Sequence, residues 1–191
     1  MTTKGLRDQL RIAYQNRPNL FDRKIVLADP LYDHIVEVDE RVTSSGKILI
    51  PIDKEKLFNE LRKIKNVKKK SCAIVFMHSC KFNKHEKEAE QIAKILGFSH
   101  ISLSYRTSQI MKYVMRGDTT VADAYLSPVL NRYIQSLYSE FEGDISSKIS
   151  FMQSNGGLTN ASLFSGKDSI LSGPAGGAVS YTHLTLPTKQ D

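Results

Sequence analysis

A strand–helix–strand pattern in the middle of the chain constrains the fold more than any other feature of the sequence. Residues 72–78 form a short apolar run bounded by polar residues, which is typical of a buried strand. Asn83 followed by Glu86 resembles a capping box at the start of a helix, and Gly97 is well placed to end that helix. The apolar face of this helix consists of Ala89, Ile92, Ala93 and Leu96. Residues 98–104 then alternate between apolar and polar side chains, which predicts a second strand. This order predicts a βαβ unit, with parallel strands and a right-handed crossover.

A strand pair and a capped helix are predicted before this unit. Residues 35–42 alternate between apolar and polar side chains, which predicts one half-buried strand. Residues 43–46 are a turn signal, and residues 47–52 have the pattern of a returning strand. Asp53 is placed to cap the helix that follows, in which large aliphatic side chains recur at helical spacing.

The second half of the chain continues the alternation of helix and strand. Residues 119–141 have a helical pattern, which Pro128 should kink or restart and which Gly143 and Asp144 should end. Residues 148–153 are strand-like again. Together these patterns place the chain in the α/β class.

The composition is that of a soluble globular protein. Of the 191 residues, 40% are hydrophobic and 25% are charged, which suffices for the core of one ordinary domain or parts of two. No apolar run approaches the ~20 residues that span a bilayer, so no membrane partner is expected. Cys72 and Cys80 lie in or beside an apolar run, which favours reduced thiols in a cytoplasmic protein over a disulfide framework.

The net charge of +7 raises the question of a nucleic-acid partner. Much of the positive charge gathers between Arg62 and Lys70, at the end of a predicted helix and in the turn after it, where cations suit the helix dipole and solvent. No zinc-finger, homeodomain or RNA-recognition signature accompanies this cluster. We therefore expect no nucleic acid among the partners, and a basic binding module without catalysis is the alternative of another class.

Residues 172–177, Ser-Gly-Pro-Ala-Gly-Gly, have the composition of a phosphate-handling segment. Proline suits the first turn of a helix, and glycines let a phosphate approach the free amides at a helix N-terminus. Tight helix packing explains the same glycines equally well, and the segment matches neither a P-loop nor a dinucleotide fingerprint. The candidate cofactor-binding residues are Ser172, Gly173, Gly176 and Gly177.

A second glycine segment follows the last predicted strand. Amide and hydroxyl side chains beside two glycines suit a polar ligand at the carboxyl edge of a sheet, whereas a plain turn would use Asn-Gly for its positive φ. The candidate cleft residues here are Gln153, Ser154, Asn155, Gly156 and Gly157.

The segment before the long predicted helix offers weaker candidates. Asp118 or Thr119 is placed to cap that helix, and Arg116 suits either an anion clamp or a surface charge. Asp123 lies inside the predicted helix, where an ion pair explains it as well as catalysis does. The candidates from this segment are Arg116, Thr119, Thr120 and Asp123.

The histidines form no set with metal-ligand spacing, so no metal site is predicted. His78 and Cys80 are two residues apart on a predicted strand end, which raises the idea of a nucleophile pair. No third group is placed to orient a base there, so we favour the interpretation that these two residues only end a strand. No residue is identified as the catalytic base.

The last residues do not continue the pattern of the chain. One reverse translation of residues 180–188 resembles the transposon-end adapter that is used to build sequencing libraries. We therefore expect residues 179–191 to be a non-native tail, and we set them aside in the prediction of the fold.

Seven segments occur in a fixed order: residues 2–8, 16–22, 36–42, 76–79, 116–128, 151–158 and 171–177. Together they resemble the ATP-dependent 5-oxoprolinase and hydantoinase A family, from Thr2 to about Ala178. The Asn-Arg-Pro triplet and the Glu-Val-Asp-Glu-Arg segment favour the 5-oxoprolinase branch over N-methylhydantoinase or an acetone carboxylase subunit.

The resemblance implies an ATPase fold of the actin and sugar-kinase type, with ATP and magnesium between two related lobes. It implies an ATP-dependent amide hydrolase of glutathione metabolism that opens the lactam 5-oxo-L-proline to L-glutamate, with N-methylhydantoinase A or an acetone carboxylase-like subunit as the alternative. The implied partners are a small lactam or hydantoin substrate and either a second copy of the protein or a hydantoinase B-type domain.

The family's two Asp-x-Gly-Gly-Thr phosphate loops do not occur in this sequence. The chain thus resembles part of one lobe, incomplete at both ends, with residues 1–112 closing the N-terminal domain and residues 113–178 beginning the hydantoinase A domain. We expect the chain by itself neither to bind ATP tightly nor to turn over substrate.

Overall fold

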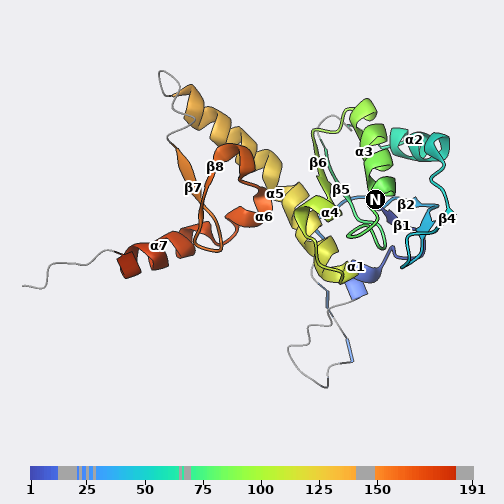
Figure 1. Cartoon of the computed structure of the whole chain (residues 1–191), viewed down its shortest axis with the longest axis horizontal. Helices are drawn as coiled ribbons and strands as arrows, with labels where there is room; N and C mark the ends of the chain where they lie inside the picture. Colours follow the sequence, from blue (N-terminus) through green and yellow to red (C-terminus); the bar gives the residue numbers. More distant parts are fainter. Residues whose placement is uncertain are drawn as a thin grey trace, which may run out of the picture. The chain divides into compact units, whose positions relative to one another are not determined.

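The architecture is that of a computed structural model, which describes residues 1–12, 21, 23–24, 26–27, 29–64, 66, 70–140 and 149–183. The chain forms two units, Met1–Tyr125 and Leu126–Asp191, and each is described by itself (Figure 1). Several predicted features lie outside the described residues, namely residues 16–20 and 22 of one family segment, Lys65, Lys68 and Lys69, Phe141, Gly143 and Asp144, Lys148 and residues 184–191.

The first unit alternates strands and helices. Its elements are β1 (Thr2–Thr3), α1 (Gln9–Ile12), β2 (Glu37–Val38), β3 (Arg41–Val42), β4 (Ile48–Ile50), α2 (Lys54–Arg62), β5 (Ser71–Ile74), α3 (Lys84–Leu96), β6 (His100–Leu103) and α4 (Ser104–Thr107), and it includes the first part of α5 (Tyr113–Ser139). Within the described part of the chain, no helix combines the length and the apolar character that crossing a lipid bilayer requires.

Parallel strands form the centre of this unit. The pairs β1–β2 and β5–β6 are both parallel, and a parallel bridge between Thr2 and Val75 connects the two pairs. The amino group of Met1 donates to the carbonyl oxygen of Ala73 at 2.6 Å, so β1 lies directly against β5. The predicted β5–α3–β6 unit is therefore confirmed, and with it the α/β class.

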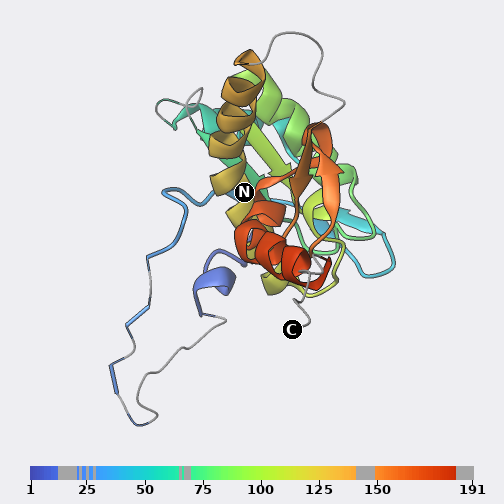
Figure 2. The same ribbon diagram turned by 90° about the vertical axis from the view of Figure 1, so that its left-hand side faces the viewer.

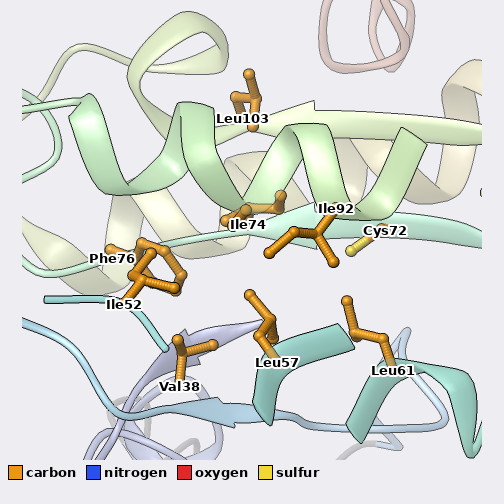
Figure 3. Close-up of a cluster of buried hydrophobic side chains, with 10 residues drawn as sticks. Val38, Ile52, Leu57, Leu61, Cys72, Ile74, Phe76, Ile92 and Leu103 are labelled. Carbon is orange, nitrogen blue, oxygen red and sulfur yellow. The ribbon is translucent and has the colours of Figure 1, made fainter. Parts of the chain in front are cut away.

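One apolar core joins the strands to α2 and α3. Figure 3 shows Leu57 and Leu61 of α2 facing the side chains of β5 and α3. Ile74 is fully buried at the centre, since a short parallel strand covered by helices presents apolar side chains to them. The buried members of the core are Val38, Ile52, Leu57, Leu61, Cys72, Ile74, Phe76, Ala89, Ile92 and Leu103.

The prediction of one strand over residues 35–42 is wrong. Residues 37–38 pair with β1, whereas residues 41–42 pair with β4 in an antiparallel hairpin whose turn contains Gly46 at a φ of 89°. Asp39 and Glu40 separate the two strands because their carboxylates bind groups on other elements, Lys4 and Lys56 for Asp39 and His85 for Glu40.

The capping predictions for α2 and α3 are confirmed in part. The Asp53 side chain accepts a hydrogen bond from the backbone amide of Lys56 at 3.0 Å, so the predicted cap of α2 is confirmed. Gly97 ends α3 in the left-handed conformation, as predicted. The capping box is wrong, because Asn83 makes no side-chain capping bond and the Glu86 carboxylate is bound elsewhere.

Helix α5 begins at Tyr113, before the predicted start at Thr119, and the assigned helix runs without a break through Pro128. Asp118 and Thr119 therefore lie within the helix, and the prediction that one of them caps it is wrong. A Cβ on Gly117 would lie 2.6 Å from a methyl carbon of Leu10, so the absence of a side chain at this position lets α1 approach α5.

The second unit is a hairpin with short helices. Its elements after α5 are β7 (Ser150–Met152), β8 (Leu158–Asn160), the 3₁₀-helix η2 (Ala161–Leu163), α6 (Gly166–Ser169) and α7 (Ser172–His183). β7 and β8 are antiparallel and paired only with each other among the described residues, so the predicted strand is half of a hairpin and not part of an open parallel sheet. Figures 1 and 2 both show α7 beside this hairpin.

Gly166 is predicted to be intolerant of any side chain. A Cβ at this position would lie 2.7 Å from the backbone nitrogen of Ser127 and 2.9 Å from the Cβ of Leu126, and backbone atoms cannot move aside cheaply. We expect Gly166→Ala to lower the free energy of unfolding by about 1–3 kcal/mol, the usual range for overpacking. Gly173→Ala is the matched control, because a Cβ added at Gly173 would have no neighbour within 4 Å. Urea titration followed by circular dichroism measures both, and equal stabilities would contradict the prediction.

Candidate functional site

The carboxyl ends of the parallel strands in the first unit form the site that the fold favours. In open α/β sheets, ligands bind outside these ends, where the chain leaves the strands. Here the segments after β1, β2 and β5 and the helix α4 after β6 meet at one edge. Buried polar side chains hold these segments together.

Glu86 is the central acceptor of this edge and is fully buried. Its carboxylate accepts hydrogen bonds from the backbone amide of Phe76 at 3.0 Å, the hydroxyl of Ser104 at 2.5 Å and the backbone amide of Tyr105 at 3.2 Å. Burial raises the pKa of the carboxyl group, and the bonds from Ser104 and Phe76 offset part of this effect. Glu86 therefore joins the end of β5 to the start of α4.

Arg116 of α5 is the matching buried donor, with only 1% of its surface exposed. Its guanidinium donates to the carbonyl oxygen of Phe76 at 2.9 Å and to the hydroxyl of Ser104 at 3.0 Å. It also donates to the carbonyl oxygens of Ile110 and Met111, at 2.9 and 3.2 Å. The same two residues, Phe76 and Ser104, are thus held by Glu86 and by Arg116.

A second buried group ties β1 to the segment after β2. The Glu40 carboxylate accepts a hydrogen bond from the Thr3 hydroxyl, and its other oxygen lies 2.7 Å from Nδ1 of His85. The Thr3 hydroxyl oxygen also accepts the backbone amide of Met77 at 3.0 Å. At the solvent-exposed side, hydrogen bonds from Lys4 and Lys56 lower the pKa of Asp39 to about 2.

The bonds of Glu86 and Arg116 to Phe76 and of Thr3 to Met77 hold the start of residues 77–80, which we call the His78 loop. Ser79 donates to the carbonyl oxygen of Phe76 at 2.8 Å and lies 3.0 Å from the hydroxyl of Ser104. His78 is half-buried and has a φ of 58°, in the left-handed region that non-glycine residues seldom occupy. The network therefore fixes a loop in which Met77, His78 and Cys80 are half-buried and Ser79 is buried.

The candidates predicted from residues 116–123 lie on α5 and bind within the protein. The hydroxyls of Thr119 and Thr120 donate to the carbonyl oxygens one turn earlier, at 2.8 and 2.7 Å. Asp123 accepts the hydroxyl of Ser102 at 2.6 Å. Arg116 is a brace of the His78 loop, and its guanidinium bonds to buried groups of the protein, so the geometry gives it a positioning role and not that of a surface charge.

The glycine segments of the second unit lie together. Gly156 has a φ of 83° in the turn of the β7–β8 hairpin, and the Asn155 side chain accepts the amide of Gly157 at 2.8 Å. The Ser154 hydroxyl donates to the carbonyl oxygen of Asp168 and accepts the amide of Leu171, at 2.7 and 3.0 Å. Ser154 thereby fixes the hairpin turn against the residue that precedes α7.

Residues 172–177 form the first turns of α7, as the proline in this segment predicted. Gly173 and Gly177 have no neighbour within 4 Å of an added Cβ, whereas one on Gly176 would lie 3.7 Å from Met152 of β7. On the other side, a Cβ on Gly156 would lie 3.2 Å from Val179. The structure thus brings the two glycine segments of the sequence side by side, and their binding of a nucleotide or substrate stays a prediction. The remaining members of these predicted sets, Gln153 and Ser172, belong to the same hairpin turn and helix start.

The buried groups Glu40, His85 and Glu86 were not among the candidates from the sequence. One signal was available for Glu86, which lies three and seven residues before Ala89 and Ala93 and therefore on the apolar face of its helix. A carboxylate on a buried face needs partners, so the pattern pointed to a polar network. In the described part of the chain, no group of three or more histidine, cysteine, aspartate or glutamate side chains is arranged to hold a metal ion.

Comparison with known proteins places the chain in a family. Residues 1–97 match the model of the hydantoinase/oxoprolinase N-terminal region, and residues 116–191 match that of hydantoinase/oxoprolinase. The chain belongs to the hydantoinase/oxoprolinase family. The predicted family is thereby confirmed, and the division at residue 112 and the non-native origin of residues 179–191 stay predictions.

The relatives are similar over almost the whole chain. The chain is 39% identical to the 5-oxoprolinase of Saccharomyces cerevisiae and 38% identical to 5-oxoprolinase 1 of Arabidopsis thaliana, over 95% and 94% of its length. It spans only 16% of the length of each of these relatives.

Two solved structures share the fold. The ATP-dependent caprolactamase of Pseudomonas jessenii superposes with a TM-score of 0.72 at 24% identity, and nucleotide-free acetone carboxylase with a TM-score of 0.73 at 19% identity. The matches cover 95% and 94% of this chain and 28% of each solved chain.

Proposed function

We propose that this chain is a part of an ATP-dependent lactam hydrolase that converts 5-oxo-L-proline to L-glutamate in the cytoplasm. The observation that carries the proposal is the 39% identity to a 5-oxoprolinase over 95% of the chain. A relative named caprolactamase subunit alpha is 28% identical over 71% of the chain, so the similarity to proteins named for 5-oxoproline is the stronger one.

The chemistry explains why ATP and magnesium would take part. A five-membered lactam reacts slowly with water, and phosphorylation of its carbonyl oxygen would create a far better electrophile. Magnesium would offset the negative charge of the phosphates. In this proposal the adjoining glycine segments of the second unit, residues 153–157 and 172–177, lie near the nucleotide, where helix amides and open glycines suit a phosphate.

The test is an assay of the full-length protein that carries this chain. With 5-oxo-L-proline, magnesium and ATP, we expect glutamate and ADP to be formed together, and no glutamate when ATP is omitted. Caprolactam and N-methylhydantoin serve as competing substrates, and acetone with bicarbonate tests for a carboxylase. Preference for one of these over 5-oxo-L-proline would replace the proposed substrate, and no turnover of any of them would refute the hydrolase.

For the 191-residue chain alone we propose that it is inactive and binds ATP weakly. The chain lacks both Asp-x-Gly-Gly-Thr loops that the family resemblance leads one to expect around the phosphates. Titration calorimetry with ATP and magnesium should give no measurable heat of binding at micromolar concentrations. Micromolar affinity would show that the segments present in this chain suffice for nucleotide binding.

A further inference from the structure

The His78 loop combines a backbone conformation that its sequence does not favour with a dense set of buried supports. Among the described residues outside glycine, only Asn66 and His78 have a positive φ, both at 58°. Asparagine in an exposed turn adopts this conformation readily. At a loop beyond a parallel strand, such a conformation persists only when its surroundings determine it, and these conformations gather at functional sites.

The supports come from β1, α3 and α5 and from Ser79 of the loop itself, and they bind Phe76 and Met77, just before the histidine. Both backbone groups of Phe76 are bound, the amide by Glu86 and the carbonyl by Arg116 and Ser79. The next amide, that of Met77, is bound by Thr3. Burying charged groups costs free energy unless they are paired. Several buried polar groups are nevertheless used here to fix the position of the loop.

The imidazole of His78 is the part of the loop that these supports leave for another partner. The backbone carbonyl of His78 accepts the amides of Lys81 and Phe82, both at 3.0 Å, whereas its ring nitrogens make no hydrogen bond among the described residues. The ring is half-buried and stands at the carboxyl end of β5. Imidazole is the side chain best suited to accept and return a proton near neutral pH.

A cation lies next to this loop. The guanidinium of Arg41 contacts the sulfur of Met77 at 3.4 Å and donates to the carbonyl oxygen of Lys4 at 3.1 Å. A guanidinium beside a strand end is a fitting partner for a small carboxylate. The edge therefore offers a proton-transferring group and an anion-binding group within adjoining segments.

We propose that His78 is a catalytic residue that transfers a proton during opening of the lactam, with Arg41 binding the substrate carboxylate. This inference rests on the proposed lactam hydrolase. The oxygen of a water molecule bonds to the lactam carbonyl carbon, which ATP has activated, and the imidazole accepts a proton from that water. As the C–N bond breaks, the imidazole returns the proton to the ring nitrogen and is neutral again, and the carbon keeps the phosphoryl group as an acyl phosphate. A second water molecule cleaves this acyl phosphate, which releases inorganic phosphate and leaves the side-chain carboxylate of glutamate.

The test uses the full-length protein that carries this chain, in wild-type form and as His78→Asn and His78→Gly. Both substitutions suit a positive φ, so both should fold. Asn66→Gly is the matched control, because it places glycine at a residue that has the same φ of 58° but lies outside the loop. We expect each His78 variant to lose at least ~100-fold in kcat with KM changed less than about threefold, the usual loss for a general acid–base group. The Asn66 variant should retain wild-type kcat.

Added imidazole provides a readout that a structural role would not move. His78→Gly leaves space where the ring stood, and millimolar imidazole should raise the kcat of this variant by at least about tenfold. The kcat of His78→Asn, in which the asparagine side chain fills the space, should not respond to imidazole. A kcat within threefold of wild type in both variants, or a loss that imidazole does not restore in the glycine variant, would overturn the role of His78. A wild-type protein that hydrolyses no lactam would instead refute the hydrolase itself, and the proton-transfer role with it.

Discussion

Arg116→Ala is expected to lower the free energy of unfolding of this chain by about 2–5 kcal/mol, the range for truncating a large buried side chain to alanine. The guanidinium is almost fully buried and donates to three carbonyl oxygens and one hydroxyl. Alanine would take this donor from the buried carbonyl of Phe76, which among the described residues would keep only the hydroxyl and the amide of Ser79, and a buried group that loses a partner costs about 1–3 kcal/mol.

Urea unfolding at pH 7, followed by circular dichroism, measures this loss. Arg106→Ala is the matched control, because Arg106 is 61% exposed and its ion pair with Glu90 spans 3.5 Å. We expect that control to change stability by at most about 0.5 kcal/mol, because Arg106 itself is exposed and Lys94 stays paired with the same Glu90 oxygen at 2.7 Å. A loss below about 1 kcal/mol for Arg116→Ala would mean that water or other donors replace the guanidinium, and that the brace is not needed to hold the His78 loop.

The parts of this fold that the sequence predicted are those set by local patterns. The buried strand at residues 71–74 and the stop at Gly97 depend on an apolar run and on a glycine, and both signals are read within a few residues. The cap at Asp53 is equally local. The family was recognisable for the same reason, because its segments are short and occur in order.

The predictions that were wrong concern features that depend on contacts between residues distant in the sequence. Asn83 and Glu86 have capping-box spacing, but Glu86 gains more from Phe76 and Ser104, which lie 10 and 18 residues away. Residues 35–42 alternate as one strand does, yet the bonds of Glu40 to distant side chains interrupt it. Pairing between such residues is a property of the assembled unit, and no single window of sequence contains it.

The candidate site likewise has features that the sequence predicted and features that only the structure shows. The glycine segments at residues 153–157 and 172–177 were identified from composition, whereas their proximity follows from the hairpin and from Ser154. Arg116 was identified as either an anion clamp or a surface charge, and its burial on α5 excludes the surface charge. A positively charged residue next to a glycine in a sequence does not show whether its charge faces solvent or a carbonyl group.

Glu86→Gln is expected to change how stability depends on pH. Burial raises the pKa of Glu86 above its ordinary value of 4.5, so the folded chain binds this proton more tightly than the unfolded chain does. Below about pH 4.5 both states carry the proton and the group adds no pH dependence. As the pH rises from there to the folded-state pKa, the unfolded state releases its proton first, and stability falls by up to about 1.4 kcal/mol per pH unit.

Glutamine cannot release a proton, so this fall should be absent from the variant. The difference between the free energies of unfolding of Glu86→Gln and wild type should therefore become more positive as the pH rises above 4.5, whatever its value at pH 4. Glu55→Gln removes an exposed carboxylate from the first turn of α2 and is the control for the loss of one charge. Urea titrations at pH 4, 5, 6 and 7 give the three curves. Parallel curves for wild type and Glu86→Gln would mean that the hydrogen bonds from Phe76, Ser104 and Tyr105 stabilise the carboxylate as fully as water does.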